Sequence, residues 1–252
     1  MSPRHLHRPG RDTLAYHYSP AAEGCRLPCV MFLGGFRSDM SGSKALALEA
    51  HCRARGQGFV RFDYSGHGVS EGRFAEGCIG QWFEDARDIL DQVVPGDVVL
   101  VGSSMGGWIS LLLLLERSER VKGLVGIAAA PDFTVAIERE LSDAQRQEVE
   151  EQGFVEVPSA YGPPYVITKK LIVDGRERCV LSRVHPIAVP VTLLHGRLDQ
   201  DVPWQTAEDI ARQFQGPQTR IVYVEDGEHR LSRPEDLERI CAEVAAMGDC
   251  VQ

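Results

Sequence analysis

Ser104, Asp199 and His229 are the residues of this sequence whose types and order best suit covalent catalysis. Ser104 is the middle residue of the pentapeptide 102–106, which has the form Gly-x-Ser-x-Gly. A serine hydroxyl is a weak nucleophile near neutral pH, so it needs a base within hydrogen-bond reach and an acid that orients the base. Serine, then acid, then histidine is the chain order found with such a pentapeptide. The sequence therefore predicts a serine nucleophile served by an Asp–His pair.

The residues around Ser104 predict a sharp turn between a strand and a helix. Residues 98–101 are aliphatic, as in a buried strand, and a leucine-rich run up to Leu115 follows without a spacer. Glycines flank the serine in such a turn because a Cβ would collide with the neighbouring strand or helix. Ser103, the adjacent hydroxyl, falls before the apex of the turn, and we interpret it as structural.

Asp199 and His229 are predicted to be the acid and the base because each follows a strand. Asp199 comes shortly after the apolar run 189–194, and His229 lies in the loop after the last predicted strand, 220–224. In these positions Asp199 would accept the Nδ1 proton of the histidine, and Nε2 would take the proton of the serine.

Other residues of the same types are weighed against this assignment. Asp201 and Asp132 remain alternatives for the acid, since one lies two residues further on and the other follows the preceding predicted strand. His185 and His195 precede or close the strand at 189–194, and we interpret both as structural.

Two backbone amides are predicted to stabilise the oxyanion that serine attack would create. Gly34 and Gly35 directly follow the buried strand 28–33, and paired glycines let the backbone fold over a cleft. The predicted donors are the N–H groups of Phe36 and Met105, the second of which follows the nucleophile. A further glycine-rich turn comes after the strand 59–63. There Asp63 and His67 are expected mainly to stabilise the turn.

Strands alternate with helices over most of the chain, which predicts an α/β fold with a largely parallel sheet covered by helices on both faces. Residues 5–7 and 13–19 read as a hairpin at one edge of the sheet. The predicted helices are 43–55, 79–93, 204–214 and one from Pro234 to about Met247. We expect a single domain over residues 1–252.

The alternation breaks between residues 132 and 186, which we expect to form a small helical cap. Ser142 and Gln145 form a capping box, which predicts a helix running to about Gln152. A loop is expected at 157–164, and a helix from Thr168 to about 175. An insertion here would lie over the carboxyl ends of the strands, where ligands bind in open α/β folds. The cap is therefore expected to select the substrate.

Composition and charge narrow the class of partner. With a formal charge of −9, nucleic acid and anionic membranes are unfavourable partners, and no apolar run is long enough to span a bilayer. The basic N-terminus lacks the apolar core of a secretory signal, and the seven scattered cysteines indicate thiols, not disulfides or a zinc site. A cytoplasmic protein without a metal or organic cofactor is predicted, acting on a small-molecule or acylated substrate. The oligomeric state is left open.

Several sequence blocks carry a family resemblance. They are Gly34-Gly35-Phe36, Ser38-Asp39-Met40, Lys44-Ala45, Arg61-Phe62-Asp63-Tyr64-Ser65-Gly66, Gly102-Ser103-Ser104-Met105-Gly106-Gly107-Trp108, Leu194-His195-Gly196 and Val202-Pro203-Trp204. The chain resembles the α/β-hydrolase superfamily over nearly its whole length, and more narrowly the mitochondrial acyl-protein thioesterase and acyl-glucuronide esterase family with its bacterial relatives. That resemblance implies the same three catalytic residues and the hydrolysis of esters or thioesters with a long acyl chain or an acyl-glucuronide group.

The expected function is thus that of a capped serine hydrolase, in which Ser104 forms an acyl-enzyme that water then releases. Two alternatives remain: a non-hydrolytic binding protein on the same fold, and a peptidase or carbon–carbon bond hydrolase that uses the same triad.

Overall fold

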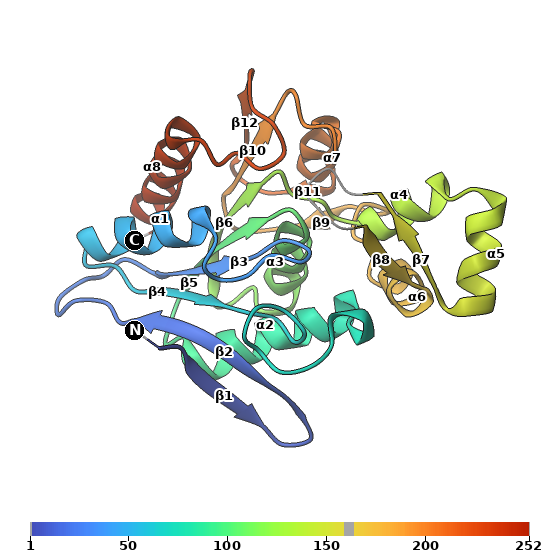
Figure 1. Ribbon diagram of the computed structural model, residues 1–252. Coiled ribbons are helices and arrows are strands. Elements are labelled where there is room, and N and C mark those ends of the chain that lie inside the picture. The colour runs from blue at the N-terminus through green and yellow to red at the C-terminus, as the bar shows by residue number, and fades with distance from the viewer. Residues whose placement is uncertain (1, 159–163, 252) are drawn as a thin grey trace.

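The predicted alternation of strands and helices forms a layered α/β fold around one large sheet (Figure 1). A computed structural model describes residues 2–158 and 164–251. In spatial order, the strands that it places in the large sheet are β1 (Arg4–Arg8), β2 (Arg11–Ser19), β4 (Phe59–Phe62), β3 (Cys29–Leu33), β5 (Val98–Ser103), β6 (Val121–Ile127), β10 (Val191–Gly196) and β12 (Thr219–Val224). The pairs β1–β2 and β2–β4 are antiparallel, and every later pair is parallel.

Helices cover both faces because the central strands are apolar on both faces. In β3, Val30 and Phe32 pack into one core cluster while Met31 and Leu33 pack into the other. The first cluster is covered by α1 (Ser43–Ala54) and α8 (Pro234–Cys250), and the second by α2 (Ile79–Val93), α3 (Met105–Glu116) and α7 (Gln205–Gln213). Alternate residues of a strand point to opposite faces, so each central strand contributes to both cores.

The segment predicted as a cap, 132–186, contributes no strand to the large sheet within the described ranges (Figure 1). Its elements are α4 (Phe133–Glu140), α5 (Asp143–Gln152), β7 (Phe154–Val157), β8 (Tyr165–Thr168), α6 (Lys169–Glu177) and the short β9 (His185–Pro186), which pairs with β11 (Phe214–Gln215). The predicted capping box is confirmed, since Ser142 and Gln145 bond reciprocally and α5 ends at Gln152. Of the loop expected at 157–164, residues 159–163 lie outside the described residues.

Asp132 joins the two ends of the cap. It stands before α4 with a φ of 58°, and its carboxylate accepts the backbone N–H groups of Val180 and Leu181, at 2.9 Å each. Burial is the largest influence on this carboxyl group and raises its pKa. The chain therefore leaves the core and returns to it at one place.

Two structural features bear on the predictions drawn from composition. All seven cysteines are free thiols, and burial raises the pKa of Cys29 and of Cys52 to about 12. Within the described ranges, the helices are too short or too polar to cross a bilayer.

Candidate active site

Ser104 lies at the junction between β5 and α3, with a φ of 53° and a ψ of −118°. This is not a helical or strand conformation, so the side chain projects from a sharp turn. A Cβ at Gly102 would overlap the carbonyl oxygen of Gly106, and one at Gly106 would overlap the carbonyl oxygen of Leu33. Both glycines are therefore needed for the close approach of β5, α3 and β3.

The structure brings Ser104, His229 and Asp199 together. His229 Nε2 lies 3.2 Å from Ser104 Oγ, and His229 Nδ1 lies 2.8 Å from Asp199 Oδ2. The loop after β10 carries the aspartate and the loop after β12 carries the histidine. The Asp199 side chain is fully buried and the His229 side chain is 15% exposed, so the imidazole can be reached from solvent while the carboxylate cannot.

Asp199 is held in its charged form. Burial alone would raise its pKa, but hydrogen bonds from His195 and His229 outweigh burial and hold the pKa well below its usual range. The backbone N–H groups of Asp201 and Val202 also donate to Oδ1, at 2.9 Å each. A carboxylate with several donors stays ionised and can stabilise an imidazolium partner.

His195, predicted to be structural, contacts the same carboxylate oxygen as His229. Its Nε2 lies 3.2 Å from Asp199 Oδ2 and 3.1 Å from the carbonyl oxygen of Val202. Both neighbours are hydrogen-bond acceptors, so this nitrogen must carry a proton. In the sequence, the only sign of this contact was that His195 and Asp199 are four residues apart. Residues at that spacing in a loop have no fixed relative position, so the spacing did not predict the contact.

The alternative residues lie elsewhere. Asp132 closes the cap, as described above, and His185 Nε2 contacts the carbonyl oxygen of Val180. Ser103 is the last residue of β5 and is buried. Asp201 is the neighbour whose backbone N–H donates to Asp199. Thus, of the residues weighed from the sequence, Asp199 is the carboxylate that meets His229.

One group in the described part of the chain has the residue types of a metal site. Ligand atoms of Asp199, Asp201 and His229 lie within 4.8 Å of one another. A cation bound there would draw on the same carboxylate and imidazole that form the 2.8 Å contact between Asp199 and His229. Metal binding and the orientation of the histidine would therefore compete.

The loop after β3 passes directly over Ser104. A Cβ on Gly35 would lie 3.4 Å from the Cβ of Ser104, in ordinary van der Waals contact, so the loop packs directly on the serine. Within the described ranges, the N–H groups of Phe36 and Met105 make no hydrogen bond to a protein acceptor. Two amides next to the serine are therefore available to a ligand oxygen. Arg37 follows with a φ of 58°, a conformation that residues with a Cβ rarely adopt.

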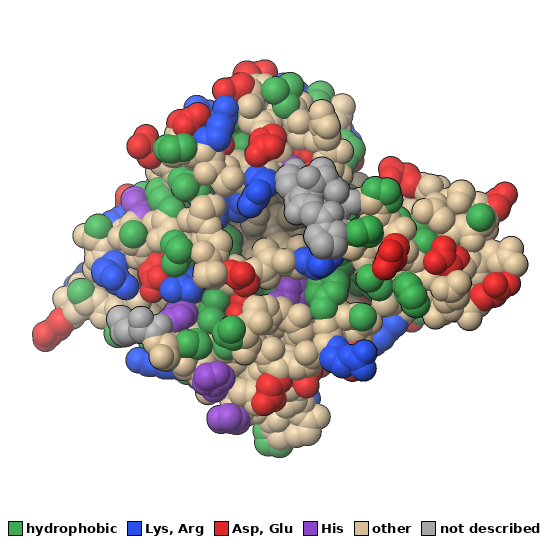
Figure 2. All heavy atoms as spheres, in the orientation of Figure 1, with side chains coloured by type: hydrophobic (Ala, Val, Ile, Leu, Met, Phe, Trp, Pro, Cys, Tyr) green, Lys and Arg blue, Asp and Glu red, His purple; other side chains and the backbone are tan. Residues whose placement is uncertain are grey.

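Aromatic side chains from the core and the cap surround this loop. The Phe36 ring makes edge-on contacts with Phe133 and Tyr165 of the cap, at centroid distances of 5.6 and 5.5 Å. The Arg37 side chain donates to the carbonyl oxygen of Pro164 and lies over the Tyr165 ring. Figure 2 shows the surface hollowed between the core and the cap. The rings of Phe36, Phe133 and Tyr165 thus form an apolar cluster around the loop that passes over the serine.

Three comparisons place the chain among known proteins. A putative hydrolase from Agrobacterium vitis S4 has a similar structure, with a TM-score of 0.92, 40% identity and coverage of 98% of this chain and 97% of that one. The mouse protein named mitochondrial palmitoyl-protein thioesterase ABHD10 is 37% identical over 84% of this chain and 72% of its own length. The structure of alpha/beta hydrolase domain-containing protein 10 from mouse matches with a TM-score of 0.92 and 34% identity over the whole of both chains.

These relatives correct the predicted location. The mouse protein and its human counterpart, which is 34% identical to this chain, are both named as mitochondrial. The prediction of a cytoplasmic protein is wrong by this comparison. It relied on the lack of an apolar signal core near the N-terminus, and that feature argues only against secretion.

A family model extends the likeness over most of the sequence. The model described as "Alpha/beta hydrolase family" matches residues 30–240, a span that includes the candidate serine, aspartate and histidine. The predicted resemblance to the thioesterase family and its bacterial relatives is likewise confirmed. The chain belongs to the α/β hydrolase family.

Proposed function

We propose that this protein is a serine hydrolase that cleaves carboxylic esters or thioesters through an acyl-enzyme. The observation that carries the proposal is the continuous contact from Ser104 Oγ to His229 and on to Asp199, at 3.2 and 2.8 Å. It supplies a nucleophile, a base that can take its proton, and a buried charge that orients the base.

The proposed reaction has two halves. In the first, Ser104 Oγ attacks the carbonyl carbon while His229 Nε2 takes its proton, and the N–H groups of Phe36 and Met105 hold the oxyanion. The intermediate collapses, the bond to the alcohol or thiol breaks, and His229 returns the proton to the leaving group. In the second half, His229 takes a proton from water, which attacks the acyl carbon. The bond to Ser104 Oγ then breaks, His229 returns the proton to that oxygen, and the acid is released. This chemistry calls for no metal or organic cofactor.

A thioester with an apolar acyl chain is the substrate we favour. The relatives that match most of the chain are named palmitoyl-protein thioesterases. The aromatic contacts of Phe36 with Phe133 and Tyr165 also offer an apolar surface beside the serine. Peptide or carbon–carbon bond cleavage would use the same triad, and a panel of substrates separates these reactions.

Labelling of the active serine tests the proposal. The native protein is treated with a fluorophosphonate and its intact mass is measured, alongside the variants Ser104→Ala, His229→Ala and, as the matched control, Ser103→Ala. One adduct is expected in the native protein and in the control, none in Ser104→Ala, and slow labelling in His229→Ala. The same proteins are assayed with acyl esters and thioesters of increasing chain length, and loss of the serine should lower kcat by at least about 10⁴-fold. Full activity in Ser104→Ala would overturn the proposal, and a folded native protein that takes up no label would favour a non-hydrolytic binding protein.

A further inference from the structure

His67 lies in the glycine-rich turn after β4 and contacts the loop that passes over Ser104. Its side chain is buried, with the residue only 3% exposed. The backbone N–H of Arg37 donates to His67 Nε2 at 3.3 Å, and His67 Nδ1 lies 3.2 Å from the carbonyl oxygen of Ser65. Arg37 directly follows Phe36, so this hydrogen bond to His67 lies one residue from the proposed oxyanion donor.

The two contacts determine which nitrogen of His67 carries the proton. A backbone N–H can only donate, so Nε2 must be unprotonated where it meets Arg37. A carbonyl oxygen can only accept, so Nδ1 must carry the proton where it meets Ser65. The rings of Tyr64, Phe74 and Trp82 enclose the imidazole at centroid distances of 5.1 to 5.5 Å. Burial among them lowers the pKa of His67 to about 4, which keeps the ring neutral near pH 7.

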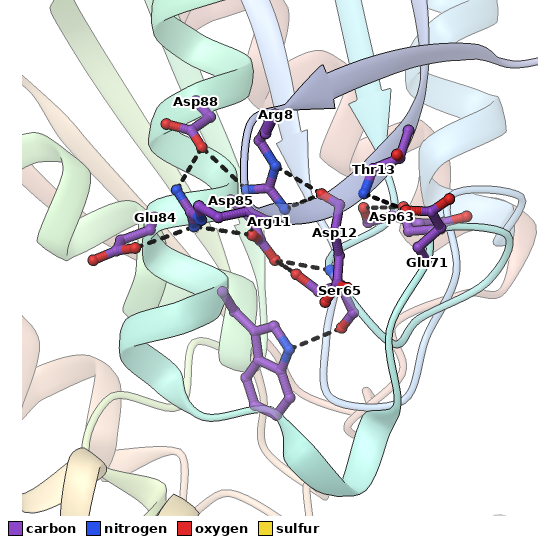
Figure 3. A network of polar contacts seen from close by, with 12 residues as sticks. Arg8, Arg11, Asp12, Thr13, Asp63, Ser65, Glu71, Glu84, Asp85 and Asp88 are labelled. Carbon is purple, nitrogen blue, oxygen red and sulfur yellow. Dashed lines mark hydrogen bonds and ion pairs between the residues drawn. The ribbon is translucent and has the colours of Figure 1, made fainter.

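Ser65, the support of His67, is itself held from the other side. Asp85 of α2 accepts both the backbone N–H and the hydroxyl of Ser65, and the Trp82 indole N–H donates to the Ser65 carbonyl oxygen at 3.1 Å (Figure 3). Arg8 of the edge hairpin then pairs with Asp85 at 2.6 Å, and both side chains are almost fully buried. A chain of buried polar contacts thus runs from the edge hairpin to the loop over the serine.

We propose that His67 is a positioning residue for the oxyanion hole: as a neutral imidazole anchored on Ser65, it accepts the Arg37 N–H and so keeps the Phe36 amide directed at Ser104. This inference rests on the proposed function. A residue in a left-handed conformation needs its surroundings to hold it, and Arg37 has a φ of 58°. Without this acceptor, the Arg37 backbone loses one of the contacts that hold its conformation, and the loop can relax away from the serine.

Two substitutions at His67 separate the acceptor from the shape of the ring. His67→Phe keeps a ring among the aromatic neighbours but removes the acceptor, and the Ser65 carbonyl still has the Trp82 N–H as a donor. His67→Gln restores an acceptor through its amide oxygen. Ser70→Ala is the matched control, because the Ser70 hydroxyl ties the same turn to β2 through Ala15 and does not contact Arg37.

Kinetics and inhibitor binding supply the measurements. An alkyl boronic acid forms a tetrahedral adduct with a catalytic serine and places one oxygen in the oxyanion hole, whereas the product fatty acid does not need that hole. In His67→Phe we expect kcat to fall about 10- to 100-fold and boronate affinity to fall in parallel, with KM and product affinity changing by less than about 3-fold. His67→Gln should recover most of the loss, and Ser70→Ala should lower thermal stability without lowering kcat.

The outcomes separate this inference from the proposed function. A folded His67→Phe protein with unchanged kcat and boronate affinity would overturn the positioning role while leaving the serine mechanism intact. The role is equally contradicted if Gln is as impaired as Phe, or if Ser70→Ala loses as much kcat, because a general loosening of the turn would then be the cause. Loss of fluorophosphonate labelling in the native protein would instead remove the proposed function itself.

Discussion

At Asp199, four donors converge on one carboxylate. Asp201 and Val202 donate through their backbone to Oδ1, and His229 and His195 meet at Oδ2. Each donor stabilises part of the negative charge of the carboxylate. How strongly Asp199 attracts the proton on His229 therefore depends on the three other donors. A buried acid of this kind acts through its whole set of neighbours.

Replacing His195 should therefore change the pH dependence of catalysis. In His195→Phe one donor is lost, the charge on Asp199 becomes more available to His229, and the protonated base is stabilised. The acidic limb of the kcat/KM profile should move to higher pH, and kcat should fall about 10-fold because the acid is less well oriented.

The control for this prediction is His195→Gln, whose amide N–H can still donate to Asp199, so its acidic limb should stay near that of the native protein. Profiles recorded from pH 5 to 9 test both variants. If His195→Phe merely lowered thermal stability and left the acidic limb in place, His195 would be a packing residue alone.

The lowered pKa of His67 predicts that the protein loses stability as the pH falls. The native ring resists protonation down to about pH 4, whereas the unfolded ring takes up a proton near pH 6.5. Between these values the unfolded state binds more protons, so the free energy of unfolding falls as the pH falls. Measured by urea unfolding, the advantage of the native protein over His67→Phe should shrink by about 2 kcal/mol from pH 7 to pH 5. An unchanged difference would show that the native imidazole is protonated as easily as a solvated one.

At the scale of elements, hydrophobic patterning predicts the central strands and the large helices well. The strands at 28–33, 59–63 and 189–194 and the helix 79–93 are found within two residues of their expected bounds. The large sheet buries both faces of each strand, so the apolar runs that predict them are also what stabilises them.

The cap is where the prediction is incomplete. Helix α4 and the hairpin of β7 with β8 were not expected, although α5 and α6 were. Strands of four residues carry little pattern of their own, and each exists because it pairs with the other. The same limit applies to the site: Ser104, Asp199 and His229 follow from motif and order, but the contacts of His195 and His67 arise from loop packing, which no spacing rule encodes.

The turn between β5 and α3 should be intolerant of a single methyl group. In Gly106→Ala the new Cβ would overlap the main chain of β3, which cannot move without disturbing the sheet. We expect a loss of about 3 kcal/mol in the free energy of unfolding, the upper end of the usual cost of overpacking. The control is Gly153→Ala at the end of α5, where φ is 82° but no atom lies within 4 Å of the new Cβ. Only the left-handed conformation is penalised there, at about 1–2 kcal/mol. Equal losses in the two variants, measured by urea unfolding, would contradict the crowding argument.

At the scale of the whole molecule, the edge hairpin is held to α2 by a buried ion pair. Arg8 and Asp85 have side chains only 3% and 0% exposed, and burial, the largest influence, raises the pKa of Asp85. Arg8→Met would leave a buried carboxylate without its main partner, which typically costs about 3–5 kcal/mol. Arg11, which also pairs with Asp85, is 31% exposed. Arg11→Met should therefore cost no more than about 1 kcal/mol.

Urea unfolding of the two variants tests this difference. The result that contradicts it is an Arg8→Met protein as stable as Arg11→Met, which would mean that Asp85 is protonated in the native state.

Compartment is a whole-molecule property that the folded chain does not record. The same sheet and site can serve in several compartments, and for this reason the predicted location was wrong while the fold was right.

The clasp formed by Asp132 has a consequence for how this protein can be altered. Because one carboxylate holds the departing and the returning chain at Val180 and Leu181, the intervening segment has both of its ends on one stem. Beyond that stem it also packs on the core, where Phe133 and Tyr165 contact Phe36. Segments of other lengths could be spliced onto that stem without changing the spacing of β6 and β10. A set of chimaeras that keep Asp132 and the cap residues in contact with Phe36 and Arg37, and that exchange the rest of the segment, would then differ in the molecules that they accept while the loop over Ser104 stays in place.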